Sequence, residues 1–336
     1  MRRFILPAGY RSVMTLRETE EGIKYCKDTF ERELAAALNL QRISAPLFVL
    51  DNTGLNDNLN GVERPVSFDV PDIPGSNVEV VHSLAKWKRM ALARYGFEPG
   101  EGLYTDMNAI RRDEETDNLH SIYVDQWDWE LILKREQRNE AFLHGIVEKI
   151  YDVFVRVQDK MHSRYKGLVN HLPERITFLT TQELEDRYPA DDVKVREDKI
   201  AKEYGAVFIQ GIGESLKGGK PHDGRAPDYD DWQLNGDILF WYPVLNAAME
   251  MSSMGIRVDA KRMVEQLKKA GCEERMRFPF HKAIVEDALP LTIGGGIGQS
   301  RMCMYMMNKA HIGEVQASLW PQDMHDKCDA AGIVLL

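Results

Sequence analysis

The sequence predicts a single α+β domain whose antiparallel β-sheet is flanked by helices. Two long hairpins, 102–130 and 237–257, carry most of the strand character, and helical segments lie before, between and after them. The chain lacks the regular alternation of strand and helix that indicates a doubly wound parallel sheet. The 336 residues show no repeat, low-complexity tract or linker, so we treat 1–336 as one domain.

The first part of the chain predicts a long helix, a loop and a shorter helix. Apolar side chains recur at helical spacing in residues 15–40. They are Leu16, Ile23, Phe30, Leu34 and Leu38. A short strand should follow and end near Pro46, and the Asn, Asp and Gly content of 51–61 predicts a loop. Residues 78–81 predict a strand, and 83–95 predict a basic helix with Ser83 as its N-cap.

The middle of the chain holds the first hairpin and the next helices. Strands 102–110 and 120–130 should pair across the charged loop RRDEETDNL, which is too long for a simple turn. A second long helix is expected at 139–161. The segment 180–205 predicts two short helices around Pro189, because proline interrupts a helix.

The last part holds the second hairpin and a glycine-rich strand. A strand at 206–213 leads into a loop with several glycines, which runs to Arg225. The second hairpin should pair 237–245 with 249–257 and turn near Asn246. A helix, a glycine-rich strand and a final helix complete the predicted order.

The composition argues against several classes of protein. Asp and Glu outnumber Lys and Arg by 53 to 43, which gives a formal net charge of −10 and disfavours extended binding to nucleic acid. The apolar run near Met1 is too short for an export signal, and the longest apolar segment, 238–245, is too short to cross a membrane. Four scattered cysteines indicate reduced thiols. We therefore expect a cytoplasmic protein with no nucleic-acid or membrane partner.

The segment TIGGGIGQSR, residues 292–301, is the most informative stretch for function. Glycines at 294–296 and 298 allow close approach by a ligand or by another chain segment. Arg301 offers a planar fork of donors that suits two phosphate oxygens. Gln299, Ser300 and Arg301 follow the last glycine, which excludes a P-loop and does not match the dinucleotide-binding fingerprint. A glycine-rich packing turn is the alternative interpretation.

The first hairpin carries polar side chains on one face. Alternation in the second strand places Gln126, Asp128 and Glu130 on one face and the tryptophans on the other. That polar face could accept hydrogen bonds from a ligand ammonium group, or it could be a solvent-facing edge. Arg111 and Arg112 end the partner strand, as a phosphate clamp or as a solvated rim.

The second hairpin repeats this pattern with acidic residues. Asp237 opens one strand, and Glu250 and Ser252 should share a face of the next. Two carboxylates on adjacent strands could hold one Mg²⁺ together with phosphate oxygens and water. They could equally pair with Arg225 or Arg257.

These segments together resemble the catalytic domain of class II aminoacyl-tRNA synthetases. The helix to Leu40 with the strand to Pro46 resembles the first motif of that fold, which builds the dimer interface. The hairpin around Arg111 resembles the second motif, and GGGIGQSR resembles the third, which ends on Arg301. Two departures are visible. Ser300 stands where an acidic residue is usual, and the spacing to Glu114 leaves open whether Arg111 or Arg112 is the second-motif arginine.

A narrower resemblance covers nearly the whole chain, from about Asn56 to Trp320. The strings EVVHSLAKWKR, GEGLYTDM, HSIYVDQWDWE, RAPDYDDW, LNGDILFWYPVL and SSMGIRVDA are similar to those of ammonia-dependent asparagine synthetase, aspartate–ammonia ligase. The chain departs from that family between Trp232 and Leu234, where it is shorter. The resemblance implies a homodimer that activates the side-chain carboxylate of L-aspartate with MgATP. Ammonia would then convert the aspartyl-β-adenylate to asparagine, with AMP and pyrophosphate as the other products.

The resemblance also implies a role for each site residue. Arg111 would hold the α-phosphate and the reacting carboxylate, Arg301 the outer phosphates, and Asp237 and Glu250 the Mg²⁺, with Arg225 also at the nucleotide. The residues implied to surround aspartate are Asp57, Ser83, Lys88, Gln126, Asp128, Ser253 and Arg257. In that set Asp128 or Asp57 suits the α-ammonium, and Arg257 or Lys88 suits the carboxylates. Asp57 or another acid would hold and deprotonate incoming ammonium; Asp57, Arg111 and Gln126 form the implied catalytic group.

Three competing functions have their own sequence requirements. A glutamine-dependent synthetase needs a nucleophilic cysteine, but Met1 is followed by Arg2 and no cysteine–histidine pair is evident. A tRNA-charging enzyme needs an anticodon-binding domain or a basic face. An inactive paralogue should have lost phosphate or metal residues, whereas Arg301 and Asp237 are both in place with their partners. The ligase is the function that we expect.

Overall fold

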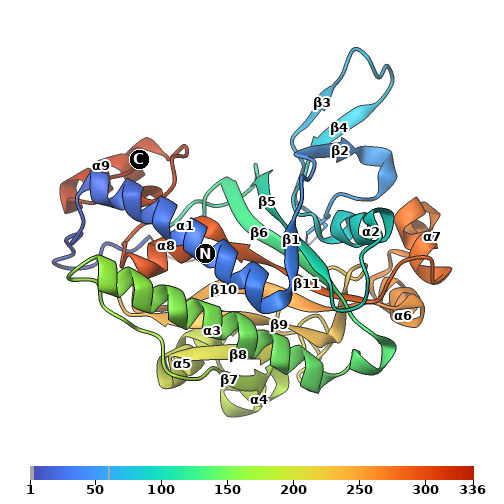
Figure 1. Ribbon diagram of the computed structural model, residues 1–336. Coiled ribbons are helices and arrows are strands. Elements are labelled where there is room, and N and C mark those ends of the chain that lie inside the picture. The colour runs from blue at the N-terminus through green and yellow to red at the C-terminus, as the bar shows by residue number, and fades with distance from the viewer. Residues whose placement is uncertain (1–3, 60) are drawn as a thin grey trace.

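The molecule is built around a mixed eight-stranded sheet, and the computed structural model describes residues 4–59 and 61–336 (Figure 1). The strand order is β1-β5-β6-β11-β10-β9-β8-β7. The strands of this sheet are β1 (Leu40–Arg42), β5 (Gly102–Ile110), β6 (Tyr123–Ile132), β7 (Thr177–Thr180), β8 (Ala206–Gln210), β9 (Asp230–Tyr242), β10 (Ala247–Arg257) and β11 (Thr292–Gly298).

The predicted antiparallel sheet is right for the centre and wrong at both edges. The strands from β5 to β8 in the sheet order pair antiparallel with their neighbours. At the edges β1 pairs parallel with β5, and β7 pairs parallel with β8. Parallel pairs need a crossover connection. Helices supply it in both cases, α2 (Ala85–Tyr95) before β5 and the pair α4 (Thr181–Arg187) and α5 (Val193–Tyr204) before β8.

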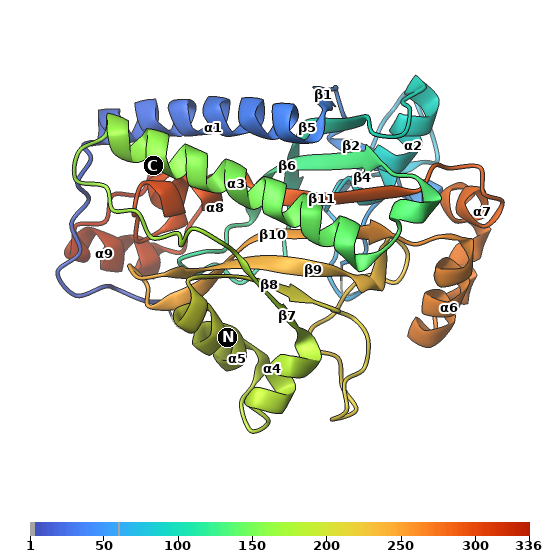
Figure 2. The same ribbon diagram turned by 60° about the horizontal axis from the view of Figure 1, so that its bottom comes forward.

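One face of the sheet is covered by long helices. Helices α1 (Leu16–Leu38) and α3 (Glu140–Arg164) lie side by side over it, with α8 (Gln299–Met306) near the end of α1 (Figure 2). Phe30 of α1 stacks on Trp127 of β6 with ring centroids 4.8 Å apart, and it also contacts Phe154 of α3. The alternation read from the sequence is therefore confirmed, because Trp127 and Trp129 both lie in this core.

The opposite face carries helices at its two ends and leaves its middle open. Helices α4 and α5 pack below the sheet in Figure 2, with Leu184 and Ile200 against Val207 and Leu239. Helix α2 lies against β6 near the other end, next to α6 (Ala260–Ala270) and α7 (Pro279–Val285). The remaining helices are α9 (Gln322–Ala331) and the 3₁₀ turns η1 (Asp51–Thr53), η2 (Arg135–Gln137), η3 (Glu273–Arg277) and η4 (Ile312–Glu314).

A small second sheet stands away from the main one, at the top of Figure 1. Its strands are β2 (Phe48–Leu50), β3 (Ser67–Asp69) and β4 (Asn77–Val80), in the order β2-β4-β3. The strand after α1 therefore ends at Arg42, before the predicted end near Pro46, and the chain leaves the main sheet to enter this one. After β2 the chain forms η1 (Asp51–Thr53), and Asp57 and Leu59 reach back to the open face.

Several element boundaries were predicted well, and others were not. Thr15 caps α1 through a capping box with Glu18, and Asn246 turns the β9–β10 hairpin with φ of 50°. The N-cap of α2 is Leu84 rather than Ser83, and the Ser83 hydroxyl donates to Asp57 and accepts from the Ala85 amide at 3.4 Å. Strand β9 starts at Asp230, well before the predicted start. In the described part of the chain no helix has the length and apolar character to cross a membrane.

Candidate active site

A cavity of about 340 Å³ opens in the middle of the uncovered sheet face. Its walls come from the loop that contains Asp57, the start of α2, strands β6, β9, β10 and β11, and the loop 222–229. The sequence-predicted residues that line it are Asp57, Ser83, Arg111, Gln126, Asp128, Arg225, Asp237, Glu250, Ser253, Arg257 and Arg301. Asp57 and Arg301 lie 244 positions apart in the chain, and the fold brings both of them to this cavity.

Lys88 is the one predicted site residue that does not line the cavity. Its ammonium group is buried beneath the wall, where it pairs with Asp128 and donates to the carbonyl oxygens of Trp129 at 3.0 Å and Gly295 at 3.2 Å. A lysine ammonium has three donors, and these partners use all of them. These partners leave Lys88 no spare donor in this arrangement, and its expected contact with aspartate stays a prediction. Lys88 fixes the Asp128 carboxylate, which also accepts from the Leu84 amide at 3.0 Å.

The glycines of β11 make room for side chains from the neighbouring strands. A Cβ at Gly294 would collide with the carboxylate of Glu130 and the guanidinium of Arg257, and one at Gly296 would collide with the Gln126 amide. A Cβ at Gly295 would lie 2.6 Å from Met254 Cβ. Of the two uses proposed for these glycines, close approach by another chain segment is the one that the structure displays. The polar side chains of β6 and β10 reach the cavity across this strand.

Two arginines face the cavity, Arg111 after β5 and Arg301 in α8. Arg111 follows β5 and lines the cavity, whereas the neighbouring Arg112 is exposed and does not. The Nε of Arg111 is buried and has no hydrogen-bond partner among the described residues. Arg301 donates to the Glu250 carbonyl at 2.9 Å and lies 4.0 Å from the Glu250 carboxylate. Both guanidiniums thus keep donor capacity for an anionic ligand.

The acidic pair lies on one face because of a bulge in β10. Asp237 is opposite Ser253, and Glu250 is opposite Leu239, with the register shift between Glu250 and Ser252. Opposed residues in an antiparallel pair point to the same side. Glu250 therefore shares its face with Ser253 and not with Ser252, which corrects the predicted alternation. One extra residue at a bulge reverses the side on which all later residues of that strand point.

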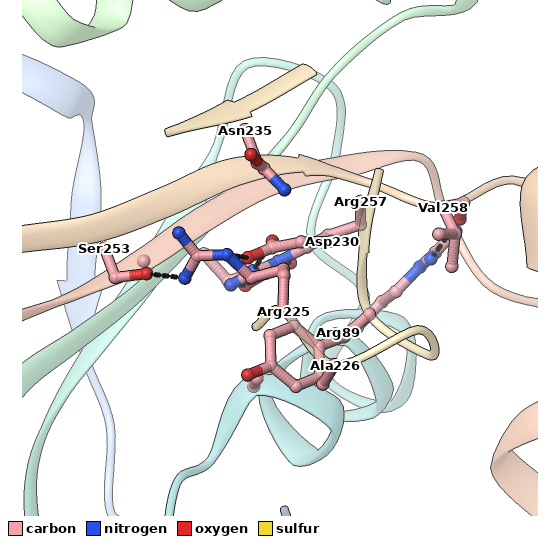
Figure 3. A network of polar contacts seen from close by, with 12 residues as sticks. Arg89, Arg225, Ala226, Asp230, Asn235, Ser253, Arg257 and Val258 are labelled. Carbon is pink, nitrogen blue, oxygen red and sulfur yellow. Dashed lines mark hydrogen bonds and ion pairs between the residues drawn. The ribbon is translucent and has the colours of Figure 1, made fainter. Parts of the chain in front are cut away.

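The electrostatics of the acidic pair differ between its two members. Burial raises the pKa of the Asp237 carboxyl to about 6, Arg225 opposes that shift, and Glu250 adds to it. Burial acts on Glu250 in the same direction, but Arg301 and other cations lower its pKa below the ordinary value. Arg225 donates to Asp237 at 2.5 Å and also contacts Ser253 (Figure 3). Arg225 Nε has no partner among the described residues.

A chain of alternating charges forms the floor behind the cavity. Arg257 donates to Glu130 through Nε at 3.0 Å and through Nη2 at 2.8 Å, and it also pairs with Asp230. Arg225 lies beside Asp230 at 3.8 Å, and Figure 3 shows these groups together. With Lys88 and Asp128 this floor holds three carboxylates and three cations, and each carboxylate is paired with at least one cation.

Asp57 is held in place by three donors. Its Oδ2 accepts from Ser83 Oγ at 2.8 Å and from Tyr229 Oη at 3.0 Å, and its Oδ1 accepts from the Leu59 amide at 2.9 Å. Burial and the carboxylates of Asp57 and Asp230 raise the pKa of Tyr229 well above its ordinary value. The phenol therefore stays protonated and donates. In the structure Ser83 therefore acts on Asp57.

Sequence reasoning missed Tyr229 and the buried residue beside it. The loop HDGRAPDYDDW was read for its aspartates and its arginine, so its tyrosine was passed over. Asp228 is fully buried and its Oδ2 contacts Lys86 at 3.2 Å, His281 at 3.0 Å and Arg275 at 3.1 Å. The available signal was the alternation Asp228, Tyr229, Asp230, which places the aromatic ring between two acids. The contacts with α2, α7 and η3 could not be read from it.

The arrangement of sheet, motifs and cavity defines the catalytic fold of class II aminoacyl-tRNA synthetases. Asparaginyl-tRNA synthetase of Pyrococcus horikoshii, solved with asparaginyl-adenylate, superposes with a TM-score of 0.65 at 14% identity, over 90% of this chain and 70% of that one. Aspartyl-tRNA synthetase of Entamoeba histolytica gives a TM-score of 0.61 at 14% identity, over 89% and 57% of the two chains. At such identities the likeness concerns the fold alone.

Sequence comparison identifies the family. The family model described as aspartate-ammonia ligase matches residues 17–332. The aspartate–ammonia ligase of Ruminiclostridium cellulolyticum is 62% identical over 336 residues and all of both chains. That of Clostridium tetani is 60% identical over 334 residues, 99% of this chain and 98% of the other. The chain belongs to the aspartate–ammonia ligase family.

Proposed function

We propose that the cavity carries out the reaction of this family, the ATP-dependent amidation of L-aspartate by ammonia to L-asparagine. The reaction would run through a β-aspartyl-adenylate and release pyrophosphate and then AMP. The observation that carries this proposal is the position of Arg111 and Arg301, two cavity-facing arginines with donors to spare, beside the carboxylates Asp237 and Glu250. Anion-binding and cation-binding groups thus share one space, as activation by MgATP requires.

Arg111 and Arg301 would act on the phosphates in the first step. An oxygen of the aspartate β-carboxylate attacks the α-phosphorus, and the bond from that phosphorus to the pyrophosphate oxygen breaks. Fixed guanidinium donors stabilise the charge that develops on the phosphate oxygens. We place Arg111 at the α-phosphate and the reacting carboxylate, Arg301 at the outer phosphates, and Arg225 at the nucleotide beside Asp237. Gln126, which projects across Gly296, would orient the β-carboxyl group.

The donor set of Asp237 and Glu250 suits Mg²⁺ when ATP is bound. The two side chains share one face, and magnesium favours one or two carboxylates together with phosphate oxygens and water. No larger cluster of His, Cys, Asp or Glu with metal-binding geometry occurs among residues 4–59 and 61–336. A bound magnesium ion would neutralise phosphate charge. The Arg225–Asp237 contact implies that the Asp237 carboxylate changes partner when the metal binds.

Asp128 would recognise the α-ammonium group of aspartate. Asp128 lines the cavity, and Lys88 and the Leu84 amide fix its orientation. Arg257 already pairs with Glu130 and Asp230, so we propose that it serves aspartate by holding these acids in place. Ser253 would complete the polar wall of this subsite.

Asp57 would hold the incoming ammonium ion in the second step. Three donors fix the orientation of the Asp57 carboxylate, whose oxygens accept hydrogen bonds and suit a cationic ligand. The ammonium loses a proton before its nitrogen attacks the adenylate carbonyl carbon, because the lone pair must be free. The carbon–nitrogen bond forms as the carbon–oxygen bond to AMP breaks. We place Asp57 as the group that receives this proton.

The test is an assay of products with each component omitted in turn. Protein incubated with aspartate, MgATP and ammonium should yield asparagine and AMP in equal amounts, and glutamine should not replace ammonium. ADP in place of AMP would contradict the adenylate route. In the absence of ammonium, aspartate should support exchange of labelled pyrophosphate into ATP, which isolates the first step.

We further propose that the protein is a homodimer that works in the cytoplasm. Leu16 on α1 is exposed, and α1 followed by the segment to Pro46 resembles the dimer-forming motif of the fold. The four cysteines are free thiols, which suits a reducing compartment. Light scattering should give twice the monomer mass at micromolar concentration, and a monomer mass in the assay buffer would refute the dimer.

A further inference from the structure

A carboxylate on the core face of β6 contacts the first turn of α8, the helix that carries Arg301. Asp125 Oδ1 accepts from the Ser300 amide at 3.0 Å, and Asp125 Oδ2 accepts from the Ser300 hydroxyl at 2.7 Å. Ser300 immediately precedes Arg301, and the side chain of Asp125 is 8% exposed. The contact thus fixes the backbone next to the arginine, and Asp125 also lines the cavity that Arg301 faces.

Helix α8 needs this contact because its own sequence provides no cap. The N-cap position is Gly298, which has no side chain, and no side-chain cap bond is made there. The first amide groups of a helix have no partner within the helix, and a carboxylate there also interacts favourably with the helix dipole. Asp125 provides both from a neighbouring strand.

Two further residues hold Asp125. Lys27 of α1 donates to Asp125 Oδ2 at 2.8 Å, and Gln316 donates to Asp125 Oδ1 at 3.2 Å and to Ser300 Oγ at 3.0 Å. Burial alone would lower the pKa of Lys27, but Asp125 and its other neighbours raise it above the ordinary value, so the lysine stays charged. The group therefore links α1, β6 and α8.

We infer that Asp125, held by Lys27, is a positioning residue that sets the orientation of Arg301 toward the nucleotide. The inference rests on the proposed role of Arg301 at the phosphates. It adds that the helix proposed for dimer contact is connected to the ATP-binding arginine through one carboxylate. A small displacement of a binding group can weaken catalysis strongly even when the chemistry of that group is unchanged.

The test is a double-mutant cycle on KM values. Asp125→Asn should raise the KM for ATP about tenfold, a change equivalent to about 1.4 kcal/mol and on the scale of one lost hydrogen bond to a charged group. The KM for aspartate should stay within about twofold, since Asp128 and its partners are not touched. In an Arg301→Lys background the same substitution should change the KM for ATP by less than about twofold, because its effect passes through the arginine.

A matched control is Asp106→Asn. Asp106 on β5 also contacts α8, but it accepts from the Gln299 side chain at 3.2 Å and from Arg42 instead of from the helix backbone. This variant should keep the wild-type KM for ATP. If Asp125→Asn does not fold, Lys27→Met is the substitute, because it keeps the capping carboxylate and should raise the KM for ATP in the same direction.

Three results would overturn the inference. They are an unchanged KM for ATP in Asp125→Asn, an equal rise for aspartate and ATP, and the same factor in the wild-type and Arg301→Lys backgrounds. Failure of the proposed role of Arg301 at the phosphates is distinguishable, because Arg301→Lys alone would then retain the wild-type KM for ATP and the wild-type turnover. An impaired Arg301→Lys with a wild-type Asp125→Asn refutes the positioning role alone.

Discussion

Removal of the Tyr229 hydroxyl tests the ammonium subsite with a change of one atom. In Tyr229→Phe the Asp57 carboxylate keeps its bonds from Ser83 and Leu59 and loses the 3.0 Å bond from the phenol. A hydrogen bond to a charged group contributes about 1.5–3 kcal/mol. We therefore expect kcat/KM for ammonium to fall roughly ten- to hundredfold. The aromatic ring remains, so its packing against the neighbouring loop should survive.

Two measurements separate this step from activation of aspartate. The rate of asparagine formation against ammonium concentration gives kcat/KM for ammonium, and aspartate-dependent exchange of labelled pyrophosphate into ATP reports the first step alone. The exchange rate should remain within about twofold of wild type, because the Tyr229 hydroxyl contacts Asp57 and no phosphate-binding residue. Tyr123→Phe is the matched control: Tyr123 also lines the cavity, but its hydroxyl donates to Asn108 at 2.7 Å. Loss of exchange in Tyr229→Phe, or an unchanged kcat/KM for ammonium, would refute the reasoning.

Three other substitutions test separate parts of the site. Arg301→Lys should lower kcat by roughly 10²–10³, since a point charge does not replace two parallel donors; a kcat and ATP KM within about twofold of wild type would contradict this. Asp128→Asn should weaken aspartate binding by about 2–5 kcal/mol and leave ATP binding nearly unchanged, as titration calorimetry with each ligand would show. Asp228→Asn should reduce the free energy of unfolding in urea by about 3–5 kcal/mol at neutral pH, because the buried cations Lys86 and Arg275 lose their counter-ion. Burial would raise the pKa of Asp228, but these cations hold it well below the ordinary 3.8, so the difference from wild type should be full above that pH and shrink as the pH falls below it.

The sequence predicted the open face of the site well where strand alternation was regular. In β6 the period of two separated Gln126 and Asp128 from the tryptophans, and the structure places both polar residues in the cavity. In β10 the same reasoning failed, because a bulge depends on how two strands pair and leaves no mark in one strand alone. Ser252 was therefore assigned to the face that Ser253 occupies.

Other errors arose where a partner distant in the chain decides the role of a side chain. Ser83 is a residue type and position typical of a helix N-cap. In the structure its hydroxyl donates to Asp57, and the N-cap is Leu84. From the sequence, Lys88 was expected to be available to a ligand. In the structure its ammonium group donates to three acceptors on two other strands. The edge strands were assigned to an antiparallel sheet because a three-residue strand carries no signal of its direction.

The glycines of β11 limit how this site can change. Gly294 lies under the side chains of Glu130 and Arg257, and Gly296 lies under that of Gln126. The length of these side chains therefore limits which residue fits at each glycine position. A shorter side chain at 130 would be needed before any larger residue fits at 294. Changes in substrate preference on this face should therefore arise through paired substitutions, and single replacements in the glycine run should be tolerated least. Selection for a different amino-acid substrate would have to alter the floor and this strand together.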